Sequence, residues 1–263
     1  MSLSALLLIA NVRVLWPQGL NTSFYLDLNN FSRHTAWAHG FMHAYALWLG
    51  PVLLTIVFLL AYAYVWWRRW PHAAAVLFLG GAGTVIALGF NQLVAHAAQE
   101  LRPYHTHVHA LVLVGKTTDY SFPSDHSIVA GGLTAAVVLG ALHMSQRLRE
   151  TGPAAGSEAS RVHRALTILW IVNLVLGLFL CFGRVYVGAH YPGDVVAGFL
   201  LSFLTVVCMM LLRPLAYRLV DAIEPTVLGA LVRRPGLDPL GIGPSFGGAV
   251  RRRERLGPPA GPS

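Results

Sequence analysis

The 263-residue chain is 55% hydrophobic and only 11% charged, with a mean hydropathy of +0.57. Soluble domains carry about 25% charged residues, so these values exclude an ordinary soluble domain and indicate a membrane protein. The net charge of +8 is almost all arginine, since Lys116 is the only lysine. A basic surplus attracts either nucleic acid or anionic lipid. The long apolar segments favour lipid, so we expect the bilayer, and no nucleic acid, as a partner.

The N-terminal part, residues 1–40, is expected to be an interfacial segment. Its first sixteen residues lack a basic start and carry Arg13 within their apolar part, which favours a retained segment over a cleaved signal peptide. Residues 24–31, FYLDLNNF, mix aromatic and polar side chains. Such a mixture is typical of a segment that lies in the membrane interface.

Five apolar stretches follow, each close to the ~20 residues that cross a bilayer as a helix. We predict them at about Ala44–Trp67, Ala73–Ala97, Ser127–Met144, Leu166–Arg184 and Val195–Leu212. The fold class is therefore an all-α integral membrane protein, a bundle of about five transmembrane helices within residues 41–224. Residues 225–263 are rich in Arg, Pro and Gly, and such a composition predicts a flexible cytoplasmic tail.

The charges between the spans predict the orientation. Arginines follow the first, third and fifth spans, at positions 68, 69, 147, 149, 161, 164, 213 and 218 and in the run 251–255. By the positive-inside tendency these regions are cytoplasmic. The loops after the second and fourth spans then face outward, and the active site that they form is outward-facing.

Reactive side chains gather in these two outward loops. Arg102 and Arg184 carry permanent charge in a fork geometry that suits phosphate oxygens. Ser124, Asp125 and His126 lie where the third span begins, and free N–H groups at a helix start bind anions.

The second loop ends in a histidine and an aspartate. Pro192 fits a helix start, which puts Asp194 in the first turn within reach of His190. A carboxylate on one ring nitrogen leaves the other as a nucleophile. Two histidines, two arginines, a serine and a helix end together suit phosphoryl transfer without a metal or other cofactor.

The ordered motifs Arg102-Pro103, Pro123-Ser124-x-His126 and Arg184-x5-His190-x3-Asp194 resemble the type-2 phosphatidic acid phosphatase superfamily. The resemblance covers about residues 90–200. It implies that His190 is the nucleophile that forms a phosphohistidine and that Asp194 orients it. It also implies that His126 is the general acid and that Arg102, Ser124 and Arg184 bind phosphate.

The chain departs from the usual first motif, because Ala95 stands where the superfamily has a lysine. Lys116 or His96 could replace that cation. Asp125 stands where many members have glycine, and Gly183 where many have serine. This pattern resembles the bacterial undecaprenyl-diphosphate phosphatases. The resemblance implies hydrolysis of a polyprenyl diphosphate to the monophosphate, recycling the carrier lipid for peptidoglycan synthesis on the outer face of the bacterial plasma membrane.

Four further residues are candidates for substrate binding: Glu100, Lys116, Asp125 and His107. Glu100 could orient Arg102 through an ion pair, and His107 could contact the second phosphate of a diphosphate. A lone loop histidine is more often solvated, which is the interpretation favoured for His105 and His109. The arginines could be interface anchors, and the alternation of His105, His107 and His109 could instead bind a metal.

Two other functions stay open. One is a phosphatidylglycerol phosphate or phosphatidate phosphatase of the same superfamily. The other is a membrane transporter without enzymatic activity, although transporters place ionisable groups deep within their spans. Here these groups lie at span ends on one side. The sequence predicts no particular protein partner.

Overall fold

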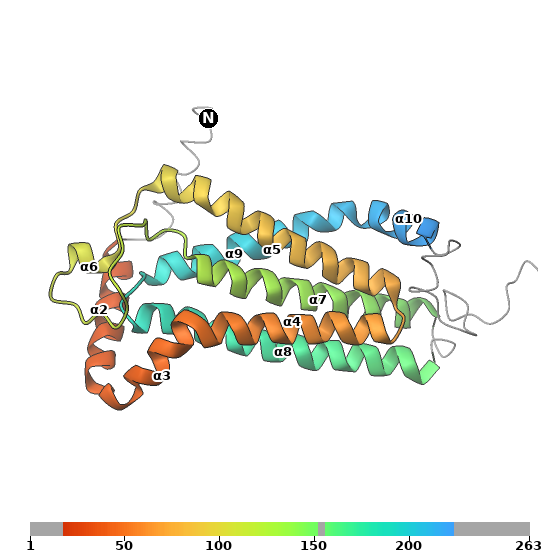
Figure 1. The fold of residues 1–263 in the computed structure, drawn as a ribbon, viewed down its shortest axis with the longest axis horizontal. Helices are drawn as coiled ribbons and strands as arrows, with labels where there is room; N and C mark the ends of the chain where they lie inside the picture. The colour runs from red at the N-terminus through yellow and green to blue at the C-terminus, as the bar shows by residue number, and fades with distance from the viewer. Residues whose placement is uncertain (1–17, 152–155, 224–263) are drawn as a thin grey trace, which may run out of the picture.

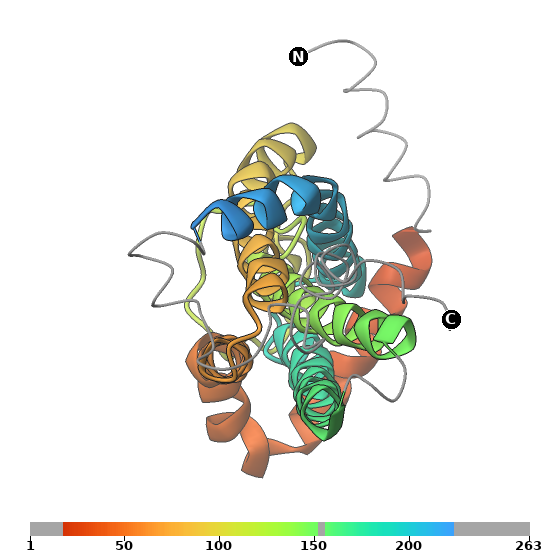
Figure 2. The same cartoon turned by 90° about the vertical axis from the view of Figure 1, so that its right-hand side faces the viewer.

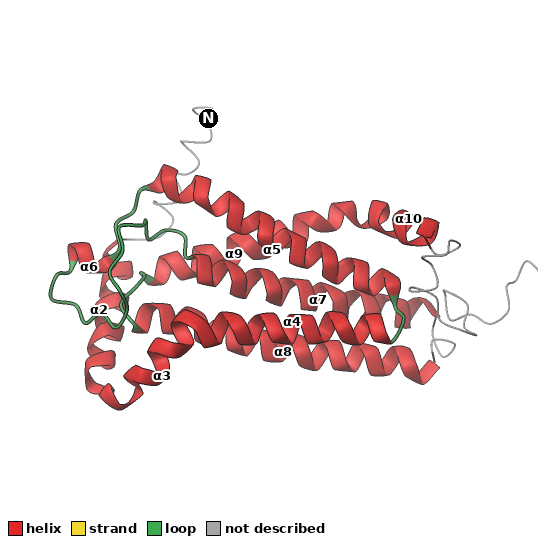
Figure 3. Cartoon of the chain, in the orientation of Figure 1, coloured by secondary structure: helices red, strands yellow, loops and turns green. Residues whose placement is uncertain are grey.

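The computed structural model describes residues 18–151 and 156–223, and within these ranges it contains helices and no strands. Five helices are long and apolar enough to cross a membrane, which confirms the prediction of an all-α, multi-pass membrane protein. They lie side by side in one bundle, as two views at right angles show (Figures 1, 2 and 3). These helices are α4 (Gly50–Trp67), α5 (Pro71–Ala98), α7 (Asp125–Thr151), α8 (Gly156–Tyr186) and α9 (Pro192–Met209). The predicted tail and the first seventeen residues lie outside the described residues.

Shorter elements lie at the two ends of the bundle. Before the first span come α2 (Gln18–His34), a 3-10 turn (Ala36–Ala38), α3 (His39–Ala44) and a π-helical turn (Tyr45–Leu49) that runs directly into α4. After it come α6 (Pro103–Thr106), a second 3-10 turn (Met210–Leu212) and α10 (Arg213–Ile223). Figure 1 shows α2 crossing one end of the bundle at a steep angle to the five long helices.

Helix α7 is the centre of the bundle and packs against α4, α5, α8 and α9. Its small side chains let the neighbours approach closely, as is common where helices pack within a membrane. A Cβ atom built on Gly131 would lie 2.1 Å from the carbonyl oxygen of Phe199 on α9. One built on Gly132 would lie 2.4 Å from the Thr84 hydroxyl on α5. Glycine at these two positions therefore fixes the spacing between α7 and its neighbours.

Two helices extend further than the apolar spans that the sequence predicted. Helix α7 continues to Thr151, past the predicted end at Met144, and α8 begins at Gly156, ahead of Leu166. The intervening residues are mostly polar, but Arg, Gln, Glu and Ala favour helix once the chain has left the hydrocarbon. Four arginines assigned to a loop therefore lie on helices.

Except for Arg33 on α2 and for Arg102 and Arg184 at the cavity, the described arginines gather at one end of the bundle, where α4 turns into α5, where α7 and α8 meet, and where α10 lies (Figure 1). There Arg68 forms an ion pair of 3.0 Å with Glu158, joining α4 to α8. Helices α2 and α6 mark the opposite end. The molecule thus has a basic end and an end that carries the loops 99–124 and 187–191.

Helix α2 holds the second end together through buried asparagines. The Asn29 amide donates to the Leu111 carbonyl at 2.7 Å and accepts from the Leu111 N–H at 3.0 Å. The Asn21 side-chain oxygen accepts from the N–H of Gly193 at 2.8 Å. Both asparagine side chains are nearly inaccessible to solvent. One helix thereby anchors the loop before α7 and the start of α9.

The glycine spacing generates a prediction about stability. Gly131→Ala should destabilise the fold by about 1–3 kcal/mol, because its new methyl group would overlap a backbone carbonyl that cannot move alone. Gly89→Ala is the matched control, since a Cβ there meets nothing within 4 Å and alanine favours helix. Thermal unfolding of both purified variants in detergent checks this. Equal unfolding temperatures for Gly131→Ala and the wild type would contradict it.

Candidate active site

A polar cavity of about 400 Å³ opens at the end of the bundle where α2 lies. Arg102 reaches it from the loop after α5 and Tyr104 from α6, whereas His126 lies in the first turn of α7 and Arg184 in the last turn of α8. His190 enters from the short connection between α8 and α9. Segments that are far apart in the sequence therefore contribute their reactive side chains to one space.

The ring of His190 is the point on which the cationic groups converge. Its Nε2 atom lies 3.0 Å from Arg102 Nη1 and 3.2 Å from Arg184 Nη2. Its Nδ1 atom lies 2.9 Å from the Ser121 carbonyl oxygen. Because guanidinium groups only donate and a carbonyl only accepts, these partners assign the proton to Nδ1 and a lone pair to Nε2.

The electrostatic surroundings keep this ring uncharged. Burial, followed by the positive charges of Arg184 and Arg102, lowers the pKa of His190 well below its ordinary value. A neutral imidazole with a free lone pair is the nucleophilic form. The same two arginines that hold Nε2 are positioned to bind the oxygens of an anion that approaches it.

Asp194 lies in the first turn of α9, where Pro192 begins the helix as expected. Its Oδ2 atom lies 3.4 Å from His190 Nδ1 and 2.9 Å from the N–H of Tyr191. The Ser121 hydroxyl donates a short hydrogen bond to the same oxygen. The Ser121 carbonyl oxygen, at 2.9 Å, is thus nearer to the Nδ1 proton than the Asp194 carboxylate, at 3.4 Å. Asp194 is fully buried. Ser121 is a positioning residue that no local sequence pattern indicates.

The π-helical turn before α4 supplies two further contacts. The N–H of Gly50 donates to Tyr45 O and not to Ala46 O, four residues back, and Pro51 has no N–H to offer Leu47 O. The two carbonyls left free are used elsewhere. Ala46 O accepts from Arg184 Nη1 at 3.2 Å, and the backbone of Leu47 is hydrogen-bonded by His126. The Gly50-Pro51 pair thereby orients two side chains of the site, at a π turn of the kind often found at functional sites.

Three buried donors near the cavity have no hydrogen-bond partner among the residues that the structure describes. They are Arg102 Nε, Arg184 Nε and the hydroxyl of Ser124. Ser124 immediately precedes α7, is fully buried, and fixes its position through its N–H, which donates to Asp194 O at 3.1 Å. Leaving buried donors unpaired costs about 1–3 kcal/mol each. An oxyanion in the cavity is the kind of ligand that would satisfy them.

The remaining candidates from the sequence are placed in different ways. Asp125 lines the cavity, and its carboxylate accepts from the Asn91 amide at 2.7 Å. Glu100 contributes its carbonyl, which accepts from the N–H of Ser121 at 2.8 Å. His107 does not line the cavity: its ring stacks on Tyr25 of α2, with centroids 5.8 Å apart.

Neither candidate for the missing lysine lines the cavity itself. The Lys116 ammonium lies 6.0 Å from the centre of the Tyr104 ring. The His96 ring meets the Tyr120 ring edge-on at 5.7 Å. Both tyrosines do line the cavity, so each cation contacts its wall through an aromatic ring.

The three alternating histidines have separate surroundings. His105 bonds the Thr117 carbonyl at 3.1 Å, whereas His107 stacks on Tyr25. Over residues 18–151 and 156–223, no three His, Cys, Asp or Glu side chains are grouped so that they could hold a metal ion.

Comparisons with known proteins identify the family of the chain. The PAP2 superfamily model matches residues 72–218, more than half of the chain. The undecaprenyl-diphosphatase of Sulfolobus acidocaldarius is 32% identical over 126 residues, or 46% of this chain and 50% of that protein. The chain thus matches about half the length of this relative. The undecaprenyl-diphosphatase BcrC of Bacillus subtilis is 26% identical over 226 residues, or 82% of this chain and 97% of that protein. No solved structure matches the chain.

The matched region runs from α5 to α10 and contains all three motifs and every cavity-lining histidine and arginine. The chain belongs to the PAP2 superfamily, the type-2 phosphatidic acid phosphatases that its sequence resembles.

Proposed function

We propose that the protein is a membrane lipid diphosphate phosphatase that hydrolyses undecaprenyl, or another polyprenyl, diphosphate to the monophosphate. The observation that carries this proposal is the convergence of Arg102 and Arg184 on the unprotonated Nε2 of His190. The names of the two relatives support a polyprenyl diphosphate as substrate. The departure at Ala95 favours this substrate over phosphatidate or phosphatidylglycerol phosphate.

The proposed reaction has two steps. In the first, the Nε2 lone pair of His190 attacks the terminal phosphorus, and the bond from that phosphorus to the bridging oxygen breaks. His126 gives a proton to that oxygen, the polyprenyl monophosphate leaves, and a phosphohistidine remains. In the second step, His126 takes a proton from water, the resulting hydroxide attacks the phosphorus, and the N–P bond breaks to release inorganic phosphate.

The surrounding donors stabilise the charge on the transferred phosphoryl group. The guanidinium N–H groups of Arg102 and Arg184 and the hydroxyl of Ser124 bind its equatorial oxygens, as phosphoryl transfer requires. Ser121 and Asp194 hold the Nδ1 proton, which keeps Nε2 directed at the phosphorus. Every step uses side chains of this chain.

We further propose that the cavity faces the outside of the bacterial plasma membrane. The cavity lies at the end of the bundle opposite the basic end, and basic ends favour the cytoplasmic side. A transporter is disfavoured because Arg102, His126, Arg184 and His190 meet at one end and do not form a path along the bundle.

The proposed mechanism predicts that His190→Asn lowers phosphate release from undecaprenyl diphosphate by at least about 10³-fold, because the nucleophile is lost. Asp194→Asn should lower it by about 10²–10⁴-fold while leaving KM similar, since it disturbs only the orientation of the ring. Activity of the wild type should persist in EDTA.

Substrate labelled on its terminal phosphate supplies the direct test. Alkaline denaturing quench should trap label on the wild-type chain and none on His190→Asn. Hydrolysis at the wild-type rate by His190→Asn, or label on another residue, would refute the assignment of the nucleophile.

The contact between His126 and the backbone of Leu47 generates a second prediction. Pro51→Ala introduces a backbone N–H that competes with His126 for the Leu47 carbonyl. We expect kcat to fall about 3–10-fold with little change in KM, because a displaced His126 would lose part of the rate gain that general acid catalysis supplies. Hydrolysis of p-nitrophenyl phosphate should change less, because its leaving group needs no proton. Pro71→Ala, at the first position of α5 on the basic end, is the matched control. Equal losses with both substrates would contradict a role through His126.

A further inference from the structure

Helix α10 packs against the basic end of the bundle with a polarity opposite to that of an ordinary surface helix. It lies on the outside of the bundle and contacts α5 (Figures 1 and 2). A surface helix normally turns its apolar side chains toward the protein and its polar side chains away from it. In α10 polar side chains meet the bundle, and apolar side chains lie on the exposed side.

Polar contacts hold one side of α10 against the bundle. The Tyr217 hydroxyl lies 3.0 Å from Nδ1 of His143, a buried histidine of α7. One turn further along α10, the Asp221 carboxylate lies 2.8 Å from Nε2 of His72 on α5. The rings of Tyr217 and His72 also contact each other, with their centroids 4.5 Å apart. These contacts fix which side of α10 faces away from the protein.

The side of α10 that faces away from the protein is apolar. Leu215, Leu219 and Ile223 recur at every fourth position and therefore share one face of the helix. Their side chains are 56%, 56% and 41% exposed. Contact of this much hydrocarbon with water is unfavourable, and the contacts of Tyr217 and Asp221 prevent the helix from turning it inward. The outward face of α10 therefore suits an apolar surrounding.

The position of α10 in the chain indicates its depth in the membrane. Helix α9 has 18 residues and rises about 27 Å at ~1.5 Å per residue, close to the ~30 Å of the hydrocarbon layer. The 3-10 turn Met210–Leu212 follows α9 directly, and α10 begins at the next residue. Helix α10 therefore starts where the hydrocarbon layer ends, at the depth of the phospholipid headgroups.

The arginines of the basic end outnumber the carboxylates that are available to pair with them. The three carboxylates that the structure describes at this end belong to Glu150, Glu158 and Asp221, and each already lies in an ion pair with another side chain. The arginines of α10 are therefore left without a carboxylate partner from the described part of this end.

Arg218 is the arginine of α10 that forms no ion pair or hydrogen bond with any residue that the structure describes, and its side chain is exposed. It flanks the apolar face, three positions after Leu215 and one before Leu219. Arg213, at the start of the helix, is also exposed, and its guanidinium carbon lies 5.9 Å from the centre of the Tyr217 ring. Two exposed cations therefore accompany the apolar face, and a guanidinium group suits phosphate oxygens.

We propose that α10 is a binding surface for anionic phospholipid. Leu215, Leu219 and Ile223 lie among the acyl chains at the membrane interface, while Arg218 and Arg213 bind the phosphate groups of the lipid headgroups. A basic amphipathic helix at this depth binds anionic lipid through its apolar area and its charge together. Nucleic acid or an acidic protein would match the charge but would leave the leucines in water. The partner follows from charge and apolar surface, whichever side of the membrane the basic end faces.

The first test measures thermal unfolding of the purified chain in a neutral detergent, with added phosphatidylglycerol or phosphatidylcholine. The variants are Arg218→Glu, which reverses the charge beside the apolar face, and Arg218→Lys, which keeps it. Arg164→Glu is the matched control, because Arg164 is also exposed at the basic end but lies on α8, which has no contact with α10. Without added lipid, all three variants should unfold at the wild-type temperature, because the structure describes no partner that these arginines would lose.

We expect phosphatidylglycerol to raise the unfolding temperature of the wild type by about 2–4 °C, as binding through one or two arginines would, and phosphatidylcholine to raise it less. Arg218→Glu should lose at least half of the shift, whereas Arg218→Lys and Arg164→Glu should keep it. Equal shifts with the two lipids, or an equal loss of the shift in Arg218→Glu and Arg164→Glu, would overturn the assignment to α10.

The second test locates the apolar face in vesicles that contain phosphatidylglycerol. A nitroxide is attached to Leu219→Cys or, as the control, to Arg164→Cys, in a chain whose exposed Cys208 is replaced by serine. The label at position 219 should be relaxed more by oxygen than by a water-soluble nickel chelate, and the label at position 164 more by the chelate. Equal exposure of the two labels to the chelate would overturn the proposal. Spin–spin broadening between labels at position 219 would assign this face to a second copy of the chain and would also overturn it.

Discussion

Two positively charged guanidinium groups, those of Arg102 and Arg184, contact the same ring nitrogen of His190, and the other contacts around the cavity depend on this arrangement. Arg102 and Arg184 each lie within hydrogen-bond distance of His190 Nε2. Like charges this close repel, and burial raises the cost because the local dielectric is low. Carbonyl groups offset part of that cost: Ala189 O accepts from Arg102, and Ala46 O accepts from Arg184. An anion bound between the two cations would offset the remainder, as the proposed binding of phosphate at this point requires.

Bringing these groups together requires precise contacts between segments that are distant in the sequence. The backbone of Leu113 in the long loop donates to Val187 O after α8 at 3.0 Å. Next to it, Gly188 has a φ of +77°, and a Cβ there would lie 2.5 Å from the Leu111 carbonyl oxygen. Only glycine fits both the left-handed backbone and the close approach. Helix α2 holds the other side of the same loop through Asn29, so the loop that carries Arg102 is fixed from two directions.

The sequence predicted those features that depend on composition or on local spacing. Five spans were confirmed because a bilayer demands long apolar runs, and Asp194 was expected in a first turn because Pro192 marks a helix start. Other features depend on partners far along the chain. Nothing near Ser121 indicates that its carbonyl and hydroxyl hold His190 and Asp194. The stacking of His107 on Tyr25 depends on where α2 crosses the bundle, which no local pattern encodes. Gly50-Pro51 was visible as a pair, but its effect on Ala46 and Leu47 follows only from the π-helical turn.

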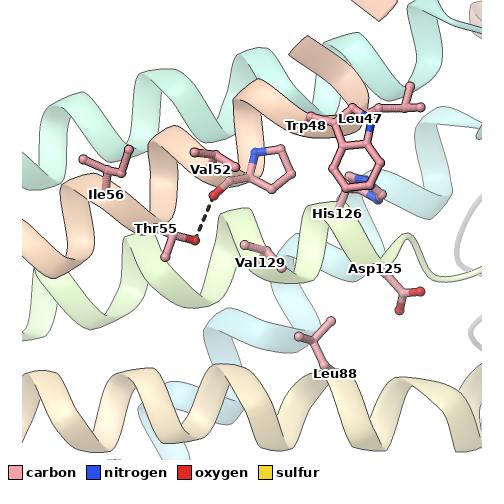
Figure 4. Close-up of a pocket in the computed structure, with 10 residues that line it drawn as sticks. Leu47, Trp48, Val52, Thr55, Ile56, Leu88, Asp125, His126 and Val129 are labelled. Carbon is pink, nitrogen blue, oxygen red and sulfur yellow. Dashed lines mark hydrogen bonds between the residues drawn. The ribbon is translucent and has the colours of Figure 1, made fainter. Parts of the chain in front are cut away.

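The position of His126 connects the chemistry with the shape of the molecule. A lipid diphosphate is divided into an anionic head and an apolar chain, and the oxygen released in the proposed reaction lies between them. In that reaction the residue that protonates this oxygen stands between the head and the chain. His126, which we propose for this role, lines both the polar cavity and an apolar hollow beside it that Val52 and Val129 also line (Figure 4). Asp125 stands at the same boundary, oriented by Asn91. Its negative charge would oppose the entry of phosphate oxygens into the apolar hollow, whereas the arginines would attract them toward His190. The arginine-lined cavity on one side of His126 and the apolar hollow on the other would thus accept a lipid diphosphate in one orientation, with its phosphates toward His190.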